Sequence, residues 1–290
     1  MEAVILASAR GETIRLALIE NGVLAEYALW RPDAPDGVGD LYTGRVAARA
    51  SALGGIFVDL GGTTGFLPDS AGGKTLSEGD IAAFRVTRAA QGGKGPRLAL
   101  AKDVSGTKPS LIARGPGPLG DWRALHPTAP IIADDYAFIA TIRHVFAPPI
   151  EHDADCFAAI EDEIASLEDL EIALPGGARA TITPTPALTA IDIDAGAATA
   201  ERGGKAASQA RLNRAIIPEL ARQIRLRNLG GAILIDFAGM KASSRAALSP
   251  DLAAALAHDP LKPRLLGFTI LGFAEVLRPR IRPPLHEILR

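Results

Sequence analysis

Leu-Thr-Ala-Ile-Asp-Ile-Asp-Ala-Gly (188–196) and Gly-Gly-Ala-Ile-Leu-Ile-Asp-Phe-Ala-Gly-Met (230–240) are apolar runs that each deliver an aspartate near the C-terminal end. A segment with helical periodicity lies between them. Strand, helix and strand in this order predict a βαβ unit, in which the two strands are parallel and usually adjacent. The carboxylates of Asp192 or Asp194 and of Asp236 should therefore emerge at the same edge of a sheet.

Carboxylates that converge at one sheet edge suit a divalent metal ion. Mg²⁺ prefers oxygen ligands and keeps several waters, so it commonly takes one or two carboxylates together with phosphate oxygens. Asp192 and Asp236 meet this requirement, and Asp194 follows Asp192 on the same face of the strand. An unpaired carboxylate is costly to bury. The pair therefore predicts either a metal site or, as the alternative, a structural salt bridge.

The segment 205–228 combines an apolar stripe with many arginines. Leucine and isoleucine recur at helical spacing, and arginines occupy the remaining faces, as either a solvated surface or a phosphate-binding one. Pro218 should kink this helix or divide it in two. Just before the helix, Arg202 and two glycines are candidates for holding a phosphate at backbone N–H groups.

Further basic residues follow the second aspartate. The segment 246–259 is predicted to be helical and 265–270 to be a strand, with Lys262 or Arg264 between them. Arg278, Arg280 and Arg282 alternate further on. In an extended segment these three side chains would lie on one side, as a path for a polyanion or as an exposed solubilising edge. Arg278 and Arg280 are taken here as candidate nucleic-acid contacts.

The first hundred residues have strand-like patterns. Three short apolar runs, with Asn21-Gly22 between the second and the third, predict a three-stranded meander with a type I′ turn. A Pro/Asp/Gly patch at 32–40 marks a boundary. Five short strands are then predicted between residues 41 and 102, and their number and spacing suggest a small closed barrel.

The barrel region has the order of motifs of an S-one-type OB-fold RNA-binding domain, which it resembles. In such domains exposed aromatic side chains stack on bases, and here Phe57 and Phe66 stand at the matching positions. The alternative is that both belong to the barrel core. Arg45 and Lys94 are candidates for phosphate contacts, with Lys94 at a tight hairpin tip.

The region after the barrel is expected to consist of a linker and a mixed segment. Residues 105–121 are rich in glycine and proline. Helices are predicted over 136–146 and 155–168, with Asp155 as the N-cap of the second. A hairpin over 171–183 should lead into the βαβ unit.

The composition excludes several classes of protein. The 290 residues are 48% hydrophobic and 22% charged with a net charge of −2, so a nucleic-acid surface must come from local segregation of charge. The single Cys156 excludes an internal disulfide framework and a cysteine-rich zinc site. We expect neither a signal peptide nor a membrane span, and a cytoplasmic location.

The motifs around both aspartates and Gly-Phe-Ala-Glu-Val-Leu-Arg-Pro-Arg (272–280) together resemble the catalytic core of the ribonuclease E/G family. The resemblance implies an α/β (α+β) chain with an RNase H-like subdomain that the OB-fold barrel interrupts, followed by a DNase I-like catalytic subdomain. The expected parts are the RNase H-like subdomain (1–35 and 122–183), the OB-fold RNA-binding domain (36–104), the linker (105–121) and the catalytic subdomain (184–290).

The family resemblance also implies an activity and its residues. It implies a Mg²⁺-dependent endoribonuclease that cleaves single-stranded RNA to leave 5′-phosphate and 3′-hydroxyl ends, with Asp192 and Asp236 as metal ligands. Asp194 stands where the family usually has Asn, at a site that orients the scissile phosphate or the attacking water. Arg264, or else Lys262, matches a basic residue near that phosphate.

The chain departs from the family pattern at several points. The paired cysteines of the zinc link are absent, which predicts a monomer or dimer and no zinc-linked tetramer, and most of the sensor for a 5′-monophosphate is missing. Gly239 replaces the acidic residue usual after the second aspartate. The rival hypothesis is an RNA-binding protein that keeps the fold with weak or no catalysis.

Overall fold

The computed structural model describes residues 2–102, 106–147, 149–196 and 205–289. The chain divides into two compact units. The first consists of residues 1–16, 28–154 and 281–283, and the second of residues 17–27, 155–280 and 284–290. None of the described helices is both long enough and apolar enough to cross a membrane.

The N-terminal meander is present as predicted. Asn21 and Gly22 both have positive φ (52° and 78°), the backbone conformation of a type I′ turn between two strands. Two later strands join the meander in a five-stranded sheet. Strand β1 (Ala3–Ser8) pairs in parallel with β10 (Ile131–Ala133), and β10 pairs in parallel with β11 (Ile150–His152). In the order β11-β10-β1-β2-β3 the strands are β11 (Ile150–His152), β10 (Ile131–Ala133), β1 (Ala3–Ser8), β2 (Ile14–Glu20) and β3 (Val23–Trp30).

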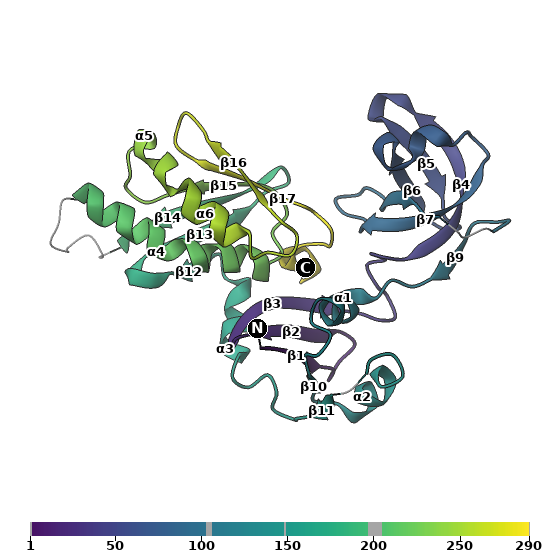
Figure 1. The fold of residues 1–290 in the computed structure, drawn as a ribbon, viewed down its shortest axis with the longest axis horizontal. Helices are drawn as coiled ribbons and strands as arrows, with labels where there is room; N and C mark the ends of the chain where they lie inside the picture. Colours follow the sequence, from purple (N-terminus) through teal and green to yellow (C-terminus); the bar gives the residue numbers. More distant parts are fainter. Residues whose placement is uncertain (1, 103–105, 148, 197–204, 290) are drawn as a thin grey trace. The chain divides into compact units, whose positions relative to one another are not determined.

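The five predicted barrel strands form a closed ring (Figure 1). The strands are hydrogen-bonded in the order β5-β6-β8-β7-β4. Pairing between the two end strands, β4 and β5, closes the sheet into a barrel around a small apolar core. The strands are β4 (Leu41–Ala50), β5 (Gly55–Asp59), β6 (Thr64–Pro68), β7 (Ile81–Arg88) and β8 (Arg97–Leu100).

The stretch expected to be a linker has structure of its own. β9 (Ser110–Ala113) adds to β4 as a sixth strand, and α1 (Gly117–Leu125) begins before the predicted end of the linker. Four exposed residues with one-sided pairing make β9 hard to detect from an apolar pattern. The segment predicted as a linker, 105–121, therefore contains a short strand and the start of a helix.

The helices between the barrel and the βαβ unit are shorter than predicted. α2 (Tyr136–Ile142) begins at Asp135, whose carboxylate accepts from Phe138 N at 2.6 Å. The second helix, α3 (Glu161–Ala165), starts six residues later than expected. The prediction that Asp155 is its N-cap is wrong, because Asp155 lies in a preceding turn.

The βαβ unit lies in a mixed six-stranded sheet. The pair β14–β15 is parallel and every other pair is antiparallel. The predicted hairpin over 171–183 pairs with this sheet, which therefore continues across the boundary expected at 183/184. In the order β12-β13-β14-β15-β17-β16 the strands are β12 (Glu171–Ala173), β13 (Arg179–Pro184), β14 (Leu188–Asp194), β15 (Gly231–Asp236), β17 (Ala274–Arg278) and β16 (Arg264–Phe268).

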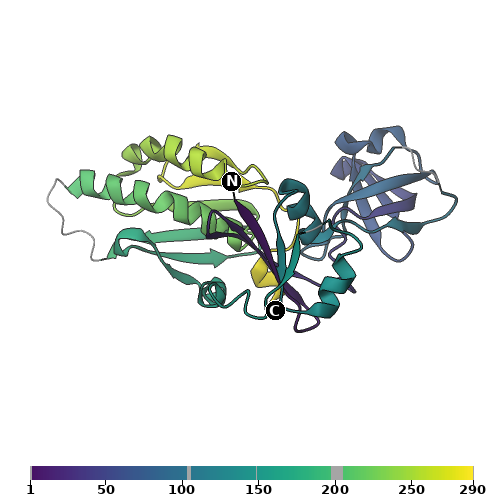
Figure 2. The ribbon, with the colours of Figure 1, turned by 60° about the horizontal axis from the view of Figure 1, so that its bottom comes forward.

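Helices cover one face of this sheet, as Figures 1 and 2 show for α4 (Lys205–Leu226) and α6 (Ser249–Leu256). Alternate strand residues such as Ile191 and Ile235 pack against the apolar stripe of α4. Pro218 lies inside α4, which continues through it as one helix. The short helices α5 (Ala242–Arg245) and α7 (Leu285–Ile288) complete the unit.

Candidate functional site

Asp192 and Asp236 are register partners on the adjacent parallel strands β14 and β15. Their neighbours Ile191, Ile193 and Ile235 are buried beneath the sheet, so both aspartates belong to the opposite face, which the helices leave open. Adjacent strands are about 4.8 Å apart. The two carboxylates therefore start from neighbouring positions on one exposed surface, as the βαβ pattern predicted.

The structure brings an arginine to this pair that the sequence did not indicate. Arg245, at the end of α5, donates from Nη1 to Asp236 Oδ1. Its Nε donates to Met240 O at 3.0 Å, and Nη1 also reaches Gly272 O at 3.2 Å. The side chain is only 12% exposed. Arg245 is thus a fixed positive charge beside one oxygen of Asp236.

Asp194 lies on the same open face and has its own partners. Gly196 N donates to Asp194 Oδ1 at 2.9 Å, and Arg179 Nη2 lies 3.3 Å from Oδ2. The N–H of Gly196 and, less strongly, the guanidinium of Arg179 lower the pKa of Asp194. Asp194 therefore remains ionised near neutral pH.

The candidate basic residues lie elsewhere. Arg264 pairs with Leu277, which pairs with Ala232, so it is on the open face four residues along the strand direction from Asp236. That offset is about 13 Å, in addition to two strand spacings. Lys262 Nζ donates to Ala257 O at 3.1 Å. The fold places neither beside the aspartate pair, and the role of Arg264 at the scissile phosphate stays a prediction.

The backbone of the loop after β15 accounts for the glycine at position 239. Gly239 has φ +63°, and a Cβ there would lie 2.1 Å from Gln209 Nε2 on α4. Next to it, the buried Asn213 donates to Ala238 O at 2.9 Å. The left-handed backbone favours glycine at this position, whereas the Gln209 side chain could move away from a Cβ.

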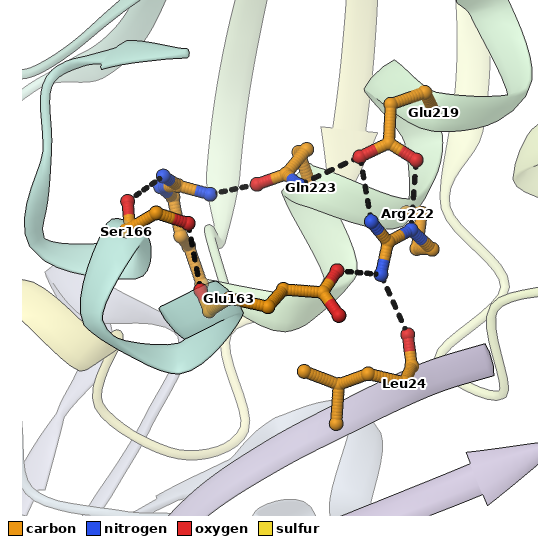
Figure 3. A network of polar contacts seen from close by, with 7 residues as sticks. Leu24, Glu163, Ser166, Glu219, Arg222 and Gln223 are labelled. Carbon is orange, nitrogen blue, oxygen red and sulfur yellow. Dashed lines mark hydrogen bonds and ion pairs between the residues drawn. The ribbon is translucent and has the colours of Figure 1, made fainter. Parts of the chain in front are cut away.

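Arginines in the C-terminal half of α4 hold the unit together and do not form an open surface. Arg222 binds Glu219 through Nε and Nη2, at 2.8 and 2.7 Å, and its Nη1 lies 2.6 Å from Glu163 Oε1 (Figure 3). Nη1 also donates to Leu24 O on β3 at 2.8 Å. Burial opposes the charge of Arg222, but its two glutamates raise its pKa.

Arg225 makes a second connection to the meander. It lies 3.2 Å from Glu20 and 2.6 Å from Glu26, and all three side chains are at least four-fifths buried. Arg227 donates to the carbonyls of Ser166 and Asp169, and its burial lowers its pKa to about 10. These arginines thus form neither a solvated face nor a phosphate-binding surface, because they are held in internal ion pairs and hydrogen bonds.

The predicted arginine path after β17 is not a single row. Arg278 is 3% exposed and its Nε bonds Asp259 at 2.6 Å, so its burial corrects the expectation that it contacts RNA. Arg280 is partly buried over the glycines at 230 and 231, and its Nε donates to Gly230 O at 3.1 Å. Arg202, the candidate phosphate residue before α4, lies outside the described residues.

The barrel presents an aromatic pair outside its core. Phe57 and Phe66 are register partners on β5 and β6, with ring centroids 5.6 Å apart in an edge-to-face arrangement. Both alternate with buried core residues, and Phe57 is 36% exposed. Arg97, which sequence reasoning missed, pairs with Phe66 from β8 and is exposed. The alternative that both phenylalanines fill the core is excluded.

The phosphate candidates on the barrel are exposed at different places. Arg45 is in register with Asp59 at the end of β5 and reaches Gly79 O at 3.4 Å. Lys94 closes a bridge with Gln91 around two glycines with positive φ, the tight hairpin tip expected from the sequence. These positions leave both side chains available for phosphate contacts.

The donor set at the open face fits a hard cation. Among the described residues no group of three or more His, Cys, Asp or Glu side chains gathers to hold a metal. A magnesium site does not require one, because Mg²⁺ commonly takes one or two carboxylates and completes its shell with water and phosphate oxygens. Asp192 and Asp236 supply such a pair.

Part of the chain that includes the aspartate pair is similar to a known protein family. Residues 144–281, which include β14, α4 and β15, match the Ribonuclease E/G family. This part of the chain is therefore similar to that family. Both aspartates lie inside it, whereas the barrel lies before it.

Relatives that the chain resembles include two ribonucleases. The chain is 38% identical over 130 residues to Ribonuclease E of Escherichia coli (strain K12), covering 44% of this chain and 12% of that protein. It is 34% identical over 131 residues to Ribonuclease G of the same strain, covering 45% of this chain and 27% of the relative. The matched segment thus spans about a quarter or less of each relative.

Proposed function

We propose that the chain is a Mg²⁺-dependent endoribonuclease of the ribonuclease E/G type. It would cleave single-stranded RNA with water as the nucleophile, leaving 5′-phosphate and 3′-hydroxyl ends. The observation that carries this proposal is the in-register pair of Asp192 and Asp236 on the open face of the sheet, inside the part of the chain that matches the family.

The chain's own residues divide the chemistry among them. Asp192 and Asp236 would hold the cation, which when bound would polarise the phosphodiester and lower the pKa of a water molecule. Asp194, whose carboxylate accepts from Gly196 N, would orient the attacking water or the scissile phosphate. Arg245 offsets negative charge that develops on the phosphoryl oxygens beside Asp236.

More distant residues would bind the rest of the RNA. Phe57 and Phe66 stack on bases, which gives affinity with little dependence on sequence, while Arg45 and Lys94 contact phosphates. Arg264 on the open face and Arg280 at the end of the same sheet extend the contacts with the phosphate backbone. Arg202, just before α4, is assigned a similar role from its sequence position.

The proposal also assigns subdomains to the sheets. The five-stranded sheet would be the RNase H-like part, the closed barrel an OB-fold insertion, and the six-stranded sheet with its helices the DNase I-like catalytic part. The enzyme would act in the cytoplasm on single-stranded RNA, as a monomer or dimer that no zinc links.

The test is cleavage of a 5′-labelled single-stranded RNA by purified protein, with Mg²⁺ or with excess EDTA. Asp236→Asn removes one ligand charge from the site. Asp251→Asn is the matched control, because Asp251 is an exposed aspartate in an ion pair with Arg214 elsewhere in the same unit.

We expect cleavage only with Mg²⁺, unchanged in the control and reduced at least 100-fold in Asp236→Asn, which corresponds to about 2.7 kcal/mol in the barrier. Cleavage that persists in EDTA or in Asp236→Asn would refute the assigned site. Tight RNA binding with no cleavage by the wild-type protein would refute the enzymatic proposal itself.

A further inference from the structure

A stacked aromatic pair lies outside the proposed catalytic surface and the barrel. Tyr136 and His152 have ring centroids 3.8 Å apart and planes inclined by only 9°. Tyr136 is 70% exposed and His152 is also exposed. Large exposed aromatic rings are informative because water solvates their faces poorly. The two rings therefore lie face to face and form an exposed aromatic platform.

The platform stands at the carboxyl edge of three parallel strands. β1, β10 and β11 run in the same direction, and Ala133 at the end of β10 is in register with His152 at the end of β11. Tyr136 follows Ala133 by three residues, at the start of α2. Ligands of open α/β sheets commonly bind at this edge, where loops from neighbouring strands converge.

A fixed arginine accompanies the aromatic pair at the same edge. Asp134, with a side chain only 4% exposed, lies 3.0 Å from Arg10 Nε and also accepts from Ser8 Oγ at 2.7 Å and Ala9 N at 2.9 Å. Arg10 also donates to Ala154 O, yet its side chain is 61% exposed. The buried carboxylate therefore holds a guanidinium in place while much of it remains in solvent.

We propose that this edge is a second binding site for single-stranded RNA, in which one base stacks on Tyr136 and Arg10 contacts a neighbouring phosphate. A π-face accepts any base, and stacking combined with one cation is the usual composition of sequence-tolerant contacts to single strands. This inference rests on the proposed function for the identity of the ligand. It adds a contact that is separate from both the barrel and the aspartate pair.

The test measures binding of a fluorescein-labelled single-stranded oligoadenylate in EDTA, by anisotropy, to the full chain carrying Phe57→Ala and Phe66→Ala. That background weakens binding by the barrel and leaves the second site to be measured. Tyr136→Ala removes the ring, Tyr136→Phe keeps it, and Val145→Ala is the control, since Val145 is 73% exposed in the same unit.

We expect Tyr136→Ala to weaken binding about 5- to 100-fold, as for other stacked bases, and Tyr136→Phe and Val145→Ala to bind like the background protein. Arg10→Lys should weaken binding while keeping a cation beside Asp134. Equal affinity of Tyr136→Ala and the control overturns the inference.

A cleavage assay distinguishes failure of the second-site inference from failure of the proposed function. A protein that cleaves RNA with Mg²⁺ but binds equally well without Tyr136 retains the proposed function and loses only the second site. A protein that neither binds oligoadenylate nor cleaves RNA loses both. Circular dichroism of Tyr136→Ala should match that of the wild type, because the side chain is mostly in solvent.

Discussion

Replacing Arg225 with alanine tests how α4 is anchored to the N-terminal meander. Arg225 is 10% exposed and pairs with Glu20 at 3.2 Å and Glu26 at 2.6 Å, from β2 and the following strand. Burial alone would lower the pKa of this arginine, but Glu26 and Glu20 raise it. The substitution leaves two mostly buried carboxylates without their shared cation.

The expected loss follows from this burial. Breaking a buried pair by removing one partner costs about 3–5 kcal/mol, whereas an exposed pair contributes about 0–1 kcal/mol. The two glutamates retain 18% and 20% exposure, so water can partly solvate them after the substitution. We therefore expect the lower end of the range, about 3 kcal/mol in the free energy of unfolding.

The assay is urea unfolding followed by far-ultraviolet circular dichroism, with hydrogen exchange of peptides from 205–226 to locate the loss. Tryptophan fluorescence is unsuitable, because Trp30 and Trp122 both lie in the other unit. Arg214→Ala is the control, since Arg214 and Asp251 are about half exposed and should contribute less than about 1 kcal/mol. If Arg225→Ala lowers the free energy of unfolding no more than the control does, the conclusion that the buried ion pairs of Arg225 anchor α4 is refuted.

Three other substitutions test the electrostatics of the same unit. Arg245→Gln should raise the Mn²⁺ affinity of the aspartate pair about tenfold at low salt. The reason is that a unit positive charge about 5 Å from a divalent cation costs roughly 1.5 kcal/mol even in water. Equilibrium dialysis measures the affinity, and an unchanged value would contradict the prediction. Arg278→Met should destabilise the fold by about 3 kcal/mol by unpairing a buried aspartate, without the loss of RNA affinity that an RNA-contacting arginine would show in a filter-binding assay. Arg179→Gln should raise the pKa of Asp194, measured by NMR titration, toward its ordinary value but not fully, since the Gly196 N–H remains. Because the folded pKa of Asp194 is lowered, its contribution to stability is present above its unfolded pKa and is lost as the pH falls through the lowered value.

Local patterns were enough to predict the N-terminal meander, the five barrel strands and the central βαβ unit. Alternation and apolar runs indicated β14 and β15, and the parallel crossover rule then brought Asp192 and Asp236 to one edge. Asn21-Gly22 fixed the hairpin, since both residues adopt the positive φ that the turn requires. These features depend on short segments whose signals do not need the rest of the chain.

Contacts between residues far apart in the sequence could not be predicted from such local patterns. Arg225 meets Glu20 and Glu26 about two hundred positions away in the sequence, and an arginine on a helix carries no mark of a distant partner. Arg278 has the same charge whether it faces solvent or Asp259. Charge alone therefore overstated the number of arginines open to RNA.

The missed members of the site have a similar explanation. Arg245 reaches Asp236 because a loop held by Asn213 and a short helix fold back on the strand end. Arg97 joins the aromatic pair through a parallel bridge to Phe66 that closes the barrel. Tertiary contacts decide which side chains these two residues meet, and periodicity does not encode such contacts.

Binding of Mn²⁺, as a spectroscopic substitute for Mg²⁺, tests most directly whether Asp192 and Asp236 share one divalent cation. Titration followed by electron paramagnetic resonance reports the free ion, and Asp251→Asn serves again as the matched control. We predict one site in the wild-type protein and in the control, weakened at least tenfold in both Asp192→Asn and Asp236→Asn. Unchanged Mn²⁺ affinity in both variants would contradict the account.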